Sequence, residues 1–538
     1  MKQIRWLFGF SAVLAVTQFS AFGQANPCPR FPAGSIVRNP PSLRSQGGSL
    51  TVNLSYNTTT DADGRTLYCF TTPNGTESPT LHVRPGDRLI VNVKNNLPKP
   101  APASAMHMST NAALVCGNAM MDASSVNIHY HGTNVSPTCH SDEVIHTMIN
   151  SGETFTYNIS FPTDEPPGLY WYHPHIHGIA EAAVQGGASA AIVVEGIENL
   201  QPAVAGLPER VLVVRDQKVA GHPTGDVPAW DLTLNYVPIS YPTLVPAVIR
   251  MERGAQEFWR VVNASADTIL DLQVLYDGTP QTLLLVGLDG VPVGSQDGTH
   301  QGKLIGVTDL RLPPAARMEF ILTGPSASVK SAQFQTQAIL TGPSGDNDTA
   351  RPLANIVGVA ASEGVNAIPA VSGAPWTPRF LDIATAPVTA NRKLYFSEFA
   401  PATGPQQFFI TVDGQKEVVF SADLPPAVVT HQGAVEDWVI ENRATENHEF
   451  HFHQIHFMVM SQDNFEINGS QPVKAIQDQL LDMIEVPFWD GIVGHPYPSV
   501  KVRMDFRGPD IGDFVYHCHI LNHEDQGMMA IIRVLPKP

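Results

Sequence analysis

The chain has 538 residues, of which 43% are hydrophobic and 15% charged, with 42 glycines and 45 prolines. This composition is typical of a globular, turn-rich protein of about three domains, and it excludes a disordered or coiled-coil chain. The net charge of −18 argues against a nucleic-acid backbone as a partner.

The N-terminus has the pattern of a secretory signal peptide. Lys2 and Arg5 precede an apolar run over 7–16, and small residues follow at 21–23. We therefore expect a signal peptide over 1–23 and an exported protein, periplasmic or secreted. The run is shorter than the ~20 residues that a membrane span needs, and no later stretch is long enough, so no span is expected.

Four of the five cysteines lie in the first quarter of the chain: Cys28, Cys69, Cys116 and Cys139. In an exported protein these four are expected to form two disulfide bonds, and the sequence leaves all three pairings open. The fifth, Cys518, stands between two histidines, which indicates a metal ligand.

A ten-residue pattern occurs three times, at 86–95, 254–263 and 433–442. Each copy starts with glycine, ends with asparagine and has β-rich residues between. A period this long predicts repeated domains. Because strand patterns dominate, we expect an all-β protein in which each domain is an antiparallel β-sandwich or Greek-key barrel. The expected boundaries are 26–198, 205–370 and 380–538, with linkers near 199–208 and 365–378.

Histidines cluster in the first and third expected domains only, while the equivalent stretch of the second, 269–274, has none. Four His-x-His pairs occur: His129 and His131, His173 and His175, His451 and His453, His517 and His519. On a strand, residues i and i+2 point to one face, so each pair delivers two imidazoles to the same side. Eight imidazoles are too many for one metal ion and suit three, with positions left for oxygen. The pairs predict a metal cluster between domains 1 and 3.

Cys518 lies between His517 and His519, so its sulfur is expected on the opposite face of the strand. There it can join His448 and His523, with Met528 as a weak axial ligand. A His₂Cys site with an axial methionine is typical of a blue-copper electron-transfer centre. The two sites would then be connected through adjacent residues of one strand.

The motifs His-x-His-Gly, Trp-Tyr-His-x-His, His-x-x-His-x-His and His-Cys-His-x-x-x-His-x-x-x-x-Met all occur, in this order. In them the chain resembles the three-domain, laccase-like multicopper oxidases, and its last motif is similar to that of bacterial cuprous oxidases and spore-coat laccases. The resemblance implies cupredoxin-like domains and four coppers. It implies type 1 copper at His448, Cys518, His523 and Met528, and type 2 at His129 and His451. It implies the type 3 pair at His131, His173, His175, His453, His517 and His519.

The chain departs from the family pattern at Glu449, where proline is usual, and at Gln454, where glycine is common. Neither position is a ligand, so copper binding is expected to survive. The loop 133–143 is about two residues longer than in the bacterial relatives. Asp142, with Glu143 next, is the candidate for the acidic residue expected near the oxygen channel.

We expect a donor near His523 or His448 to lose one electron at a time, and four electrons to reduce O₂ to two waters. The reaction consumes protons, and Glu524 and Asp142 are the candidate relays. The alternative for Glu524 is that it only orients His523.

A phenol or aromatic amine is the first choice of donor. The alternative is a cuprous-ion oxidase in copper tolerance, for which one group offers soft ligands: Met106, His107, Met108, Met120 and Met121. A non-catalytic copper-binding envelope protein is a further alternative. The protein is expected to act as a monomer.

Overall fold

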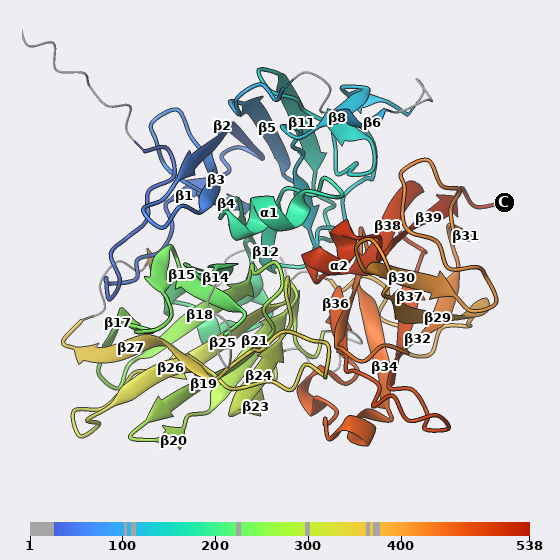
Figure 1. Ribbon diagram of the computed structural model, residues 1–538. Helices are drawn as coiled ribbons and strands as arrows, with labels where there is room; N and C mark the ends of the chain where they lie inside the picture. Colours follow the sequence, from blue (N-terminus) through green and yellow to red (C-terminus); the bar gives the residue numbers. More distant parts are fainter. Residues whose placement is uncertain are drawn as a thin grey trace, which may run out of the picture.

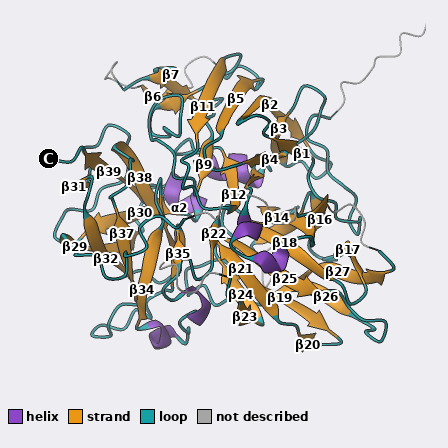
Figure 2. Cartoon of the chain, turned by 180° about the vertical axis from the view of Figure 1, so that it is seen from behind, coloured by secondary structure: helices purple, strands orange, loops and turns teal. Residues whose placement is uncertain are grey.

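The computed structural model describes residues 26–101, 105–108, 114–221, 228–295, 302–361, 366–368 and 377–538, with the backbone alone for 105–108. The predicted signal peptide lies outside these ranges. Nearly all regular structure within them is β, which confirms the predicted class. The strands form three units that follow one another along the chain and meet at the centre of the molecule (Figures 1 and 2). None of the helices in the described ranges has the length and apolar character that crossing a membrane requires.

The first unit contains two main sheets with a shared core. One has the order β1 (Ser42–Arg44), β4 (Thr80–Val83), β13 (Ala190–Val194), β12 (Gly168–His173) and β9 (His129–His131). The other has the order β11 (Thr154–Ser160), β5 (Arg88–Asn95), β2 (Ser49–Thr60) and β3 (Thr66–Thr71). Two short ribbons pair β7 (Cys116–Gly117) with β10 (Thr147–Met148) and β6 (Ala105–Met108) with β8 (Met120–Asp122). Alternate residues of β2 and β13, such as Val52 and Ile192, are buried in one hydrophobic cluster.

The second unit is built from two larger sheets. One has the order β16 (Val237–Ile239), β15 (Trp230–Leu234), β14 (Pro208–Lys218), β18 (Gln256–Asn263), β25 (Arg317–Thr323), β21 (Leu283–Leu288) and β22 (Val291–Pro292). In the same sheet β23 (Ile305–Val307) pairs with β21, and β28 (Asn366–Ala367) pairs with β14. The other has the order β17 (Ala247–Glu252), β27 (Arg351–Val359), β26 (Ala332–Thr336), β19 (Leu270–Tyr276) and β20 (Thr279–Pro280), with β24 (Asp309–Leu312) beside β19.

The third unit repeats the plan of the first. One sheet has the order β30 (Gln407–Val412), β29 (Ala390–Phe399), β32 (Val435–Asn442), β37 (Ser499–Asp505), β34 (Phe457–Asp463) and β35 (Leu480–Leu481). The other has the order β31 (Val428–His431), β39 (Met529–Leu535), β38 (Gly512–Cys518), β33 (His448–Phe452) and β36 (Met483–Val486). The short helices η3 (Phe465–Asn468) and η4 (Lys474–Ile476) lie between β34 and β35.

The expected domain boundaries stay predictions. Of the two expected linkers, 199–208 includes the end of η1 (Ile197–Asn199), all of η2 (Pro202–Val204) and the first residue of β14. Most of the other, 365–378, lies outside the described residues.

The repeated ten-residue pattern occupies the same position in each unit. Strands β5, β18 and β32 each pair with one parallel and one antiparallel neighbour. The three glycines that open the copies have positive φ, where a Cβ would be strained. The closing asparagines, Asn95, Asn263 and Asn442, are buried, and each amide donates hydrogen bonds to two backbone carbonyls. The pattern therefore encodes the same strand three times, opened by a glycine turn and closed by a buried asparagine.

The helices α1 (Ala180–Gln185) and α2 (Leu521–Asp525) lie in contact where the first and third units meet (Figure 1). The Asp525 carboxylate accepts hydrogen bonds from the backbone N–H groups of Gly178, Ala180 and Glu181, at 2.6, 3.2 and 2.9 Å. It satisfies donors at the start of α1 that have no partner within the helix. This contact fixes the segment after the second histidine pair against the third unit.

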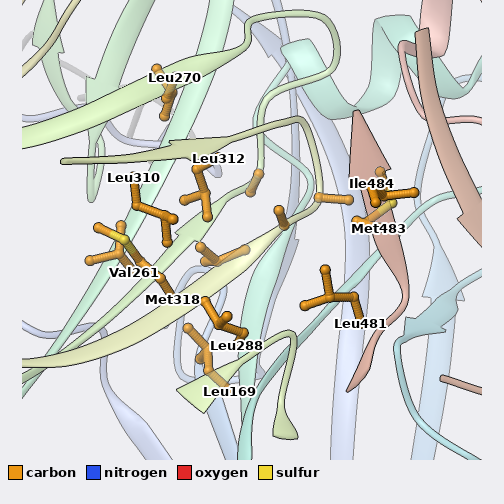
Figure 3. Packing of buried hydrophobic residues seen from close by; sticks show 14 of the residues in the cluster. Leu169, Val261, Leu270, Leu288, Leu310, Leu312, Met318, Leu481, Met483 and Ile484 are labelled. Carbon is orange, nitrogen blue, oxygen red and sulfur yellow. The ribbon is translucent and has the colours of Figure 1, made fainter. Parts of the chain in front are cut away.

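The largest hydrophobic cluster runs from the second unit into the third without interruption. Figure 3 shows Leu288 of β21 and Met318 of β25 in the same cluster as Leu481 and Met483, which flank the β35–β36 junction. The units are thus joined by a continuous core, which fixes their relative positions.

Two disulfide bonds lie in the first unit. They join Cys28 to Cys69 and Cys116 to Cys139, one of the three pairings that the sequence left open. The second bond ties down the loop 133–143. Cys518 is the one free cysteine and is buried.

Candidate metal centres

The histidine pairs are brought together by strand register. In the first unit His129 of β9 is paired with His173 of β12, and in the third unit His451 of β33 is paired with His517 of β38. In three of the four pairs the second histidine lies just beyond its strand, yet it still points to the same side as the first. The ring centroids within the four pairs are 4.9 to 5.8 Å apart even though these strands are short.

The two units face each other across the histidines. Nε2 of His517 lies 3.2 Å from Nε2 of His175 and 3.1 Å from Nε2 of His453, which places side chains of both units around one point. The rings of His129 and His453 are stacked with centroids 3.9 Å apart. All eight imidazoles are at most 1% exposed. Eight predicted ligands thus form one buried cluster between the first and third units.

The cluster has the donor set of a metal site. Several buried ring nitrogens have no hydrogen-bond partner, among them Nε2 of His129, His131, His173, His451 and His519. Buried polar atoms almost always have a partner, so this set of unpaired nitrogens among the described residues fits a metal-binding site. Burial and the neighbouring rings lower the pKa of these imidazoles, to about 4 for His175, so they are neutral and can bind a cation. Triplets such as His129, His131 and His173 bring one nitrogen each within 4.8 Å of one another.

Backbone carbonyls orient several of the rings. Nδ1 of His173 donates to the carbonyl of Pro174 at 2.9 Å, and Nδ1 of His517 donates to that of Cys518 at 2.8 Å. Nδ1 of His451 donates to the carbonyl of Asp482 at 2.8 Å. Each bond fixes the tautomer that leaves Nε2 free to bind a metal.

A second, smaller site lies on the other face of β38. Sγ of Cys518 is 3.7 Å from Nδ1 of His448 and 3.7 Å from Nδ1 of His523, and the two Nδ1 atoms are 3.1 Å apart. Burial raises the pKa of the thiol well above its ordinary value, so a thiolate here needs a bound cation. The backbone N–H of Glu449 donates to the sulfur at 3.3 Å. The arrangement is the predicted His₂Cys set.

Met528 is fully buried beside this site. Its backbone N–H donates to the carbonyl of His523, and its carbonyl accepts from the N–H of Cys518, both at 3.0 Å. The backbone of the methionine is therefore anchored to two members of the set.

Asp142 lies against the first histidine of the cluster. Its carboxyl oxygens are 3.0 Å from Nδ1 of His129, and they accept hydrogen bonds from the backbone N–H of Tyr130 at 2.8 Å and from the side chain of Gln454 at 2.7 Å. Burial raises the pKa of Asp142 well above its ordinary value, although the two donors act in the opposite direction. Glu143, the next candidate, instead binds the backbone at 145 and 146 and the hydroxyl of Thr147.

Glu524 lies on α2, directly after His523. Its carboxyl oxygens are 3.8 Å from Nδ1 of His175 and 3.5 Å from Nδ1 of His517, and neither has a hydrogen-bond partner among the described residues. Burial, with the neighbouring Asp525 charge, raises its pKa well above the ordinary value. The side chain therefore faces the histidine cluster and can hold a proton there.

Two acids that sequence reasoning missed lie behind the Cys518 site. Oε1 of Glu398 is 3.3 Å from Nε2 of His448, and Oε1 of Glu446 is 3.5 Å from Nε2 of His523. The two carboxyls interact, and burial together with Glu398 and Asp346 raises the pKa of Glu446 to about 9. Since these residues come from separate loops and strands, no local pattern reveals them.

A cavity of about 230 Å³ opens beside His523. Four acids line it: Asp267, Asp346, Asp348 and Glu446. Asp348 is 3% exposed, and one of its carboxylate oxygens has no hydrogen-bond partner. The cavity is thus an acidic chamber with a predicted metal ligand in its wall.

The methionine group considered for Cu(I) is described in part. Met120 is 38% exposed, whereas Met121 is buried and packs against Met148 and Ile176. The side chains of Met106, His107 and Met108 lie outside the described residues.

Family models described as "Multicopper oxidase" match the chain at 99–198 and 398–538, which contain all twelve predicted ligands. The first and third units of the chain therefore contain multicopper oxidase domains. The chain is an oxidoreductase, and copper is the metal that the family implies.

Relatives of this oxidase come from plants and bacteria. "Multicopper oxidase LPR1 homolog 1" of Oryza sativa is 22% identical over 475 residues, covering 76% of this chain and 74% of the relative. "Multicopper oxidase mco" of Staphylococcus aureus is 21% identical, covering 85% and 81%. A solved structure titled "Multicopper oxidase from Campylobacter jejuni: a metallo-oxidase" aligns with a TM-score of 0.66 at 22% identity, covering 94% of this chain and 96% of that one. The oxidase therefore has the cupredoxin-like fold.

One departure from the family pattern has a structural reason. Gln454 has a φ of 61°, a conformation that favours glycine. Here the glutamine side chain uses that position to bind Asp142. Glu449 is fully buried and its carboxyl oxygens have no hydrogen-bond partner.

Proposed function

We propose that the chain is a copper-dependent oxidase that accepts electrons one at a time from a donor near His523 and reduces O₂ to water at the histidine cluster. One observation carries the proposal: consecutive residues of β38 belong to two different donor sets. Cys518 belongs to the His₂Cys set and His517 to the cluster. The shortest connection between the two sets is therefore covalent.

The residues present suit four coppers. His448, Cys518 and His523, with Met528, would hold type 1 copper, and His129 and His451 would hold type 2. His131, His173, His175, His453, His517 and His519 would hold the type 3 pair. Copper, when bound, supplies the one-electron redox chemistry and the binding of oxygen.

Protons for the reaction would come from two buried carboxyls. Glu524 faces His175 and His517, and Asp142 contacts His129, so the two acids approach the cluster from different sides. Since burial raises both pKa values, each side chain holds a proton more readily than a free carboxyl does and can pass it toward reduced oxygen. The bond to His129 also gives Asp142 an orienting role.

The donor would bind in the acidic cavity beside His523. Carboxyl groups gathered around one cavity repel one another, and the pKa values of Glu446, Asp346 and Asp348 are all raised, mainly by loss of solvent around them. A bound cation relieves this repulsion. Among the expected donors, the cavity favours cations, namely a reduced metal ion such as Cu(I) or an aromatic amine in its cationic form, over a neutral phenol.

We further propose that the protein is exported. Two disulfide bonds in the first unit fit an oxidising compartment. The N-terminal pattern of 1–23 gives the same location, periplasmic or secreted.

Donor kinetics on copper-loaded protein test the proposal. We expect oxygen uptake with cationic, neutral and anionic donors of similar potential, with the highest kcat/KM for cations. Asp346→Asn, which changes the cavity without touching a predicted ligand, should raise KM for a cationic donor about fivefold, the effect of losing roughly 1 kcal/mol of ion pairing. KM for a neutral phenol should not change.

Asp463→Asn, an exposed acid on β34 outside the cavity, is the matched control and should leave both KM values unchanged. No oxygen uptake with any donor, despite bound copper, would contradict the oxidase. Equal kcat/KM for cationic, neutral and anionic donors would contradict the preference for cations but not the oxidase activity.

A further inference from the structure

The second unit supplies no predicted copper ligand, yet it sends one buried side chain to the histidine cluster. Arg317 is the first residue of β25 and is 1% exposed. Its guanidinium donates to both carboxylate oxygens of Asp482, Nη1 to Oδ1 and Nη2 to Oδ2, each at 2.6 Å. Asp482 stands between β35 and β36 of the third unit and is fully buried.

The arginine is itself held from several sides. Nη2 donates to the carbonyl of Asp289 at 2.8 Å, and Nε donates to that of Leu169 at 3.2 Å. The backbone N–H of Arg317 in turn donates to the Asp289 carboxylate at 2.8 Å. Because the N–H groups of the guanidinium are occupied on every side, the group has one position. The guanidinium therefore fixes the plane of the Asp482 carboxylate.

Asp482 contacts the cluster through two different groups. Its backbone carbonyl accepts the Nδ1–H of His451 at 2.8 Å, which leaves Nε2 of that ring for a metal. Its Oδ1 lies 3.5 Å from Nε2 of His131. Nitrogens of His131 and His451 and a carboxylate oxygen of Asp482 all lie within 4.8 Å of one another.

The Arg317–Asp482 ion pair leaves no room for a side chain at residue 132. Gly132 follows His131, and a Cβ at that position would collide with both Arg317 and Asp482. Met318, which follows Arg317, belongs to the same hydrophobic cluster as Leu481 and Met483, which flank Asp482 (Figure 3).

We propose that Arg317 and Asp482 are positioning residues for the copper cluster. Arg317 locks Asp482 so that one residue both orients His451, a predicted type 2 ligand, and holds a carboxylate oxygen 3.5 Å from His131. These contacts fix the positions of two cluster rings beside which type 2 copper would bind. The second unit would thus act on the cluster without contributing a ligand. The inference rests on the proposed function, since it assigns these residues to the copper cluster.

A merely structural ion pair would stabilise the fold without affecting the metal, and the chain offers a matched control. Arg260 of β18 is 1% exposed, lies in the same sheet and pairs with Glu209 and Glu319. Like Arg317, which forms ion pairs with Asp482 and Asp289, Arg260 is a buried arginine that pairs with two carboxylates. Among the described interactions, no histidine of the cluster contacts Glu209 or Glu319.

The test compares Arg317→Gln, Asp482→Asn and Arg260→Gln as copper-loaded full-length proteins. Copper content, the type 2 signal in electron paramagnetic resonance, visible absorption and Tm are measured. We expect Arg317→Gln and Asp482→Asn to weaken type 2 copper binding about 10–100-fold against a chelator and to shift its hyperfine splitting, while the blue absorption stays. Arg260→Gln should lower Tm and leave the type 2 signal as in the wild type.

Arg317→Lys keeps the positive charge but loses the planar guanidinium that binds both carboxylate oxygens. This variant therefore separates an effect on folding from an effect on the position of Asp482. It should fold and bind copper with a shifted type 2 signal even if Arg317→Gln does not fold. A wild-type signal and copper affinity in Arg317→Lys and Asp482→Asn would overturn the inference, and so would the same shift in Arg260→Gln. A wild-type protein that binds no copper would instead overturn the proposed function.

Discussion

His517 and Cys518 are consecutive residues of β38 whose side chains lie on opposite faces of the sheet. The imidazole of His517 is 3.1 Å from that of His453 in the cluster, while the sulfur of Cys518 is 3.7 Å from the nearest nitrogens of His448 and His523. The alternation of a β-strand therefore creates both sites and the connection between them.

The first prediction concerns Cys518→Ser. A thiolate bound to Cu(II) in a His₂Cys site gives a blue centre, so the wild type loaded with copper should be blue and the variant colourless. The variant should lose turnover with any donor, because the entry site for electrons is gone. The remaining copper should stay bound at the eight histidines. Visible absorption and copper analysis check this, and a wild type that stays colourless when oxidised and fully loaded would show that the assignment is wrong.

The second prediction concerns Glu524→Gln. The substitution keeps the size of the side chain and removes its proton. Reduction of the blue site by a donor should stay fast, whereas reoxidation by O₂ should slow by on the order of 10²-fold, a typical contribution of one acid–base group. Stopped-flow absorption separates the two half-reactions. Glu181→Gln on α1 is the control and should leave both rates unchanged. Slow reduction with normal reoxidation would mean that Glu524 orients His523 instead.

The third prediction concerns the disulfide bonds. Peptide mapping of the unreduced, alkylated protein should find Cys28 linked to Cys69 and Cys116 linked to Cys139. Replacing Cys116 and Cys139 together by alanine should lower the free energy of unfolding by about 3 kcal/mol, because the bond closes a loop with a sequence separation of 23 residues. Alkylation of any of the four cysteines would argue against these pairings.

The fourth prediction concerns pH and the metal-free protein. Burial lowers the pKa of the cluster imidazoles, to about 4 for His175, against 6.5 in the unfolded chain. The unfolded state therefore binds protons first as pH falls, so stability is complete above about pH 6.5 and is lost progressively toward pH 4. For His175 alone the loss is on the order of 3 kcal/mol. Tm of the metal-free protein should fall steadily between pH 7.5 and 5, and a constant Tm over this range would contradict the buried, neutral cluster.

The parts of the structure that depend on local periodicity were predictable from the sequence. The spacing of two between histidines, and the glycine-to-asparagine repeat, follow from single strands and turns, so the fold class and the gathering of the ligands could be derived. The contribution of Arg317 could not, because it comes from a strand of the unit that has no histidine pairs, and its partner Asp482 carries no motif. The acidic cavity combines Asp267, Asp346 and Glu446, which are far apart in the chain and meet only in the folded protein. The disulfide pairing also depends on tertiary structure and was left open for that reason.

The stoichiometry of oxygen consumption tests the central claim most directly. With copper-loaded protein and a one-electron donor, an oxygen electrode together with a peroxide assay measures how many donor molecules are oxidised for each O₂ consumed. The account predicts four donor molecules per O₂ and no hydrogen peroxide, because four electrons are needed to form two waters. Two donor molecules per O₂ with accumulating peroxide, or no oxygen uptake by protein that has bound its copper, would contradict it.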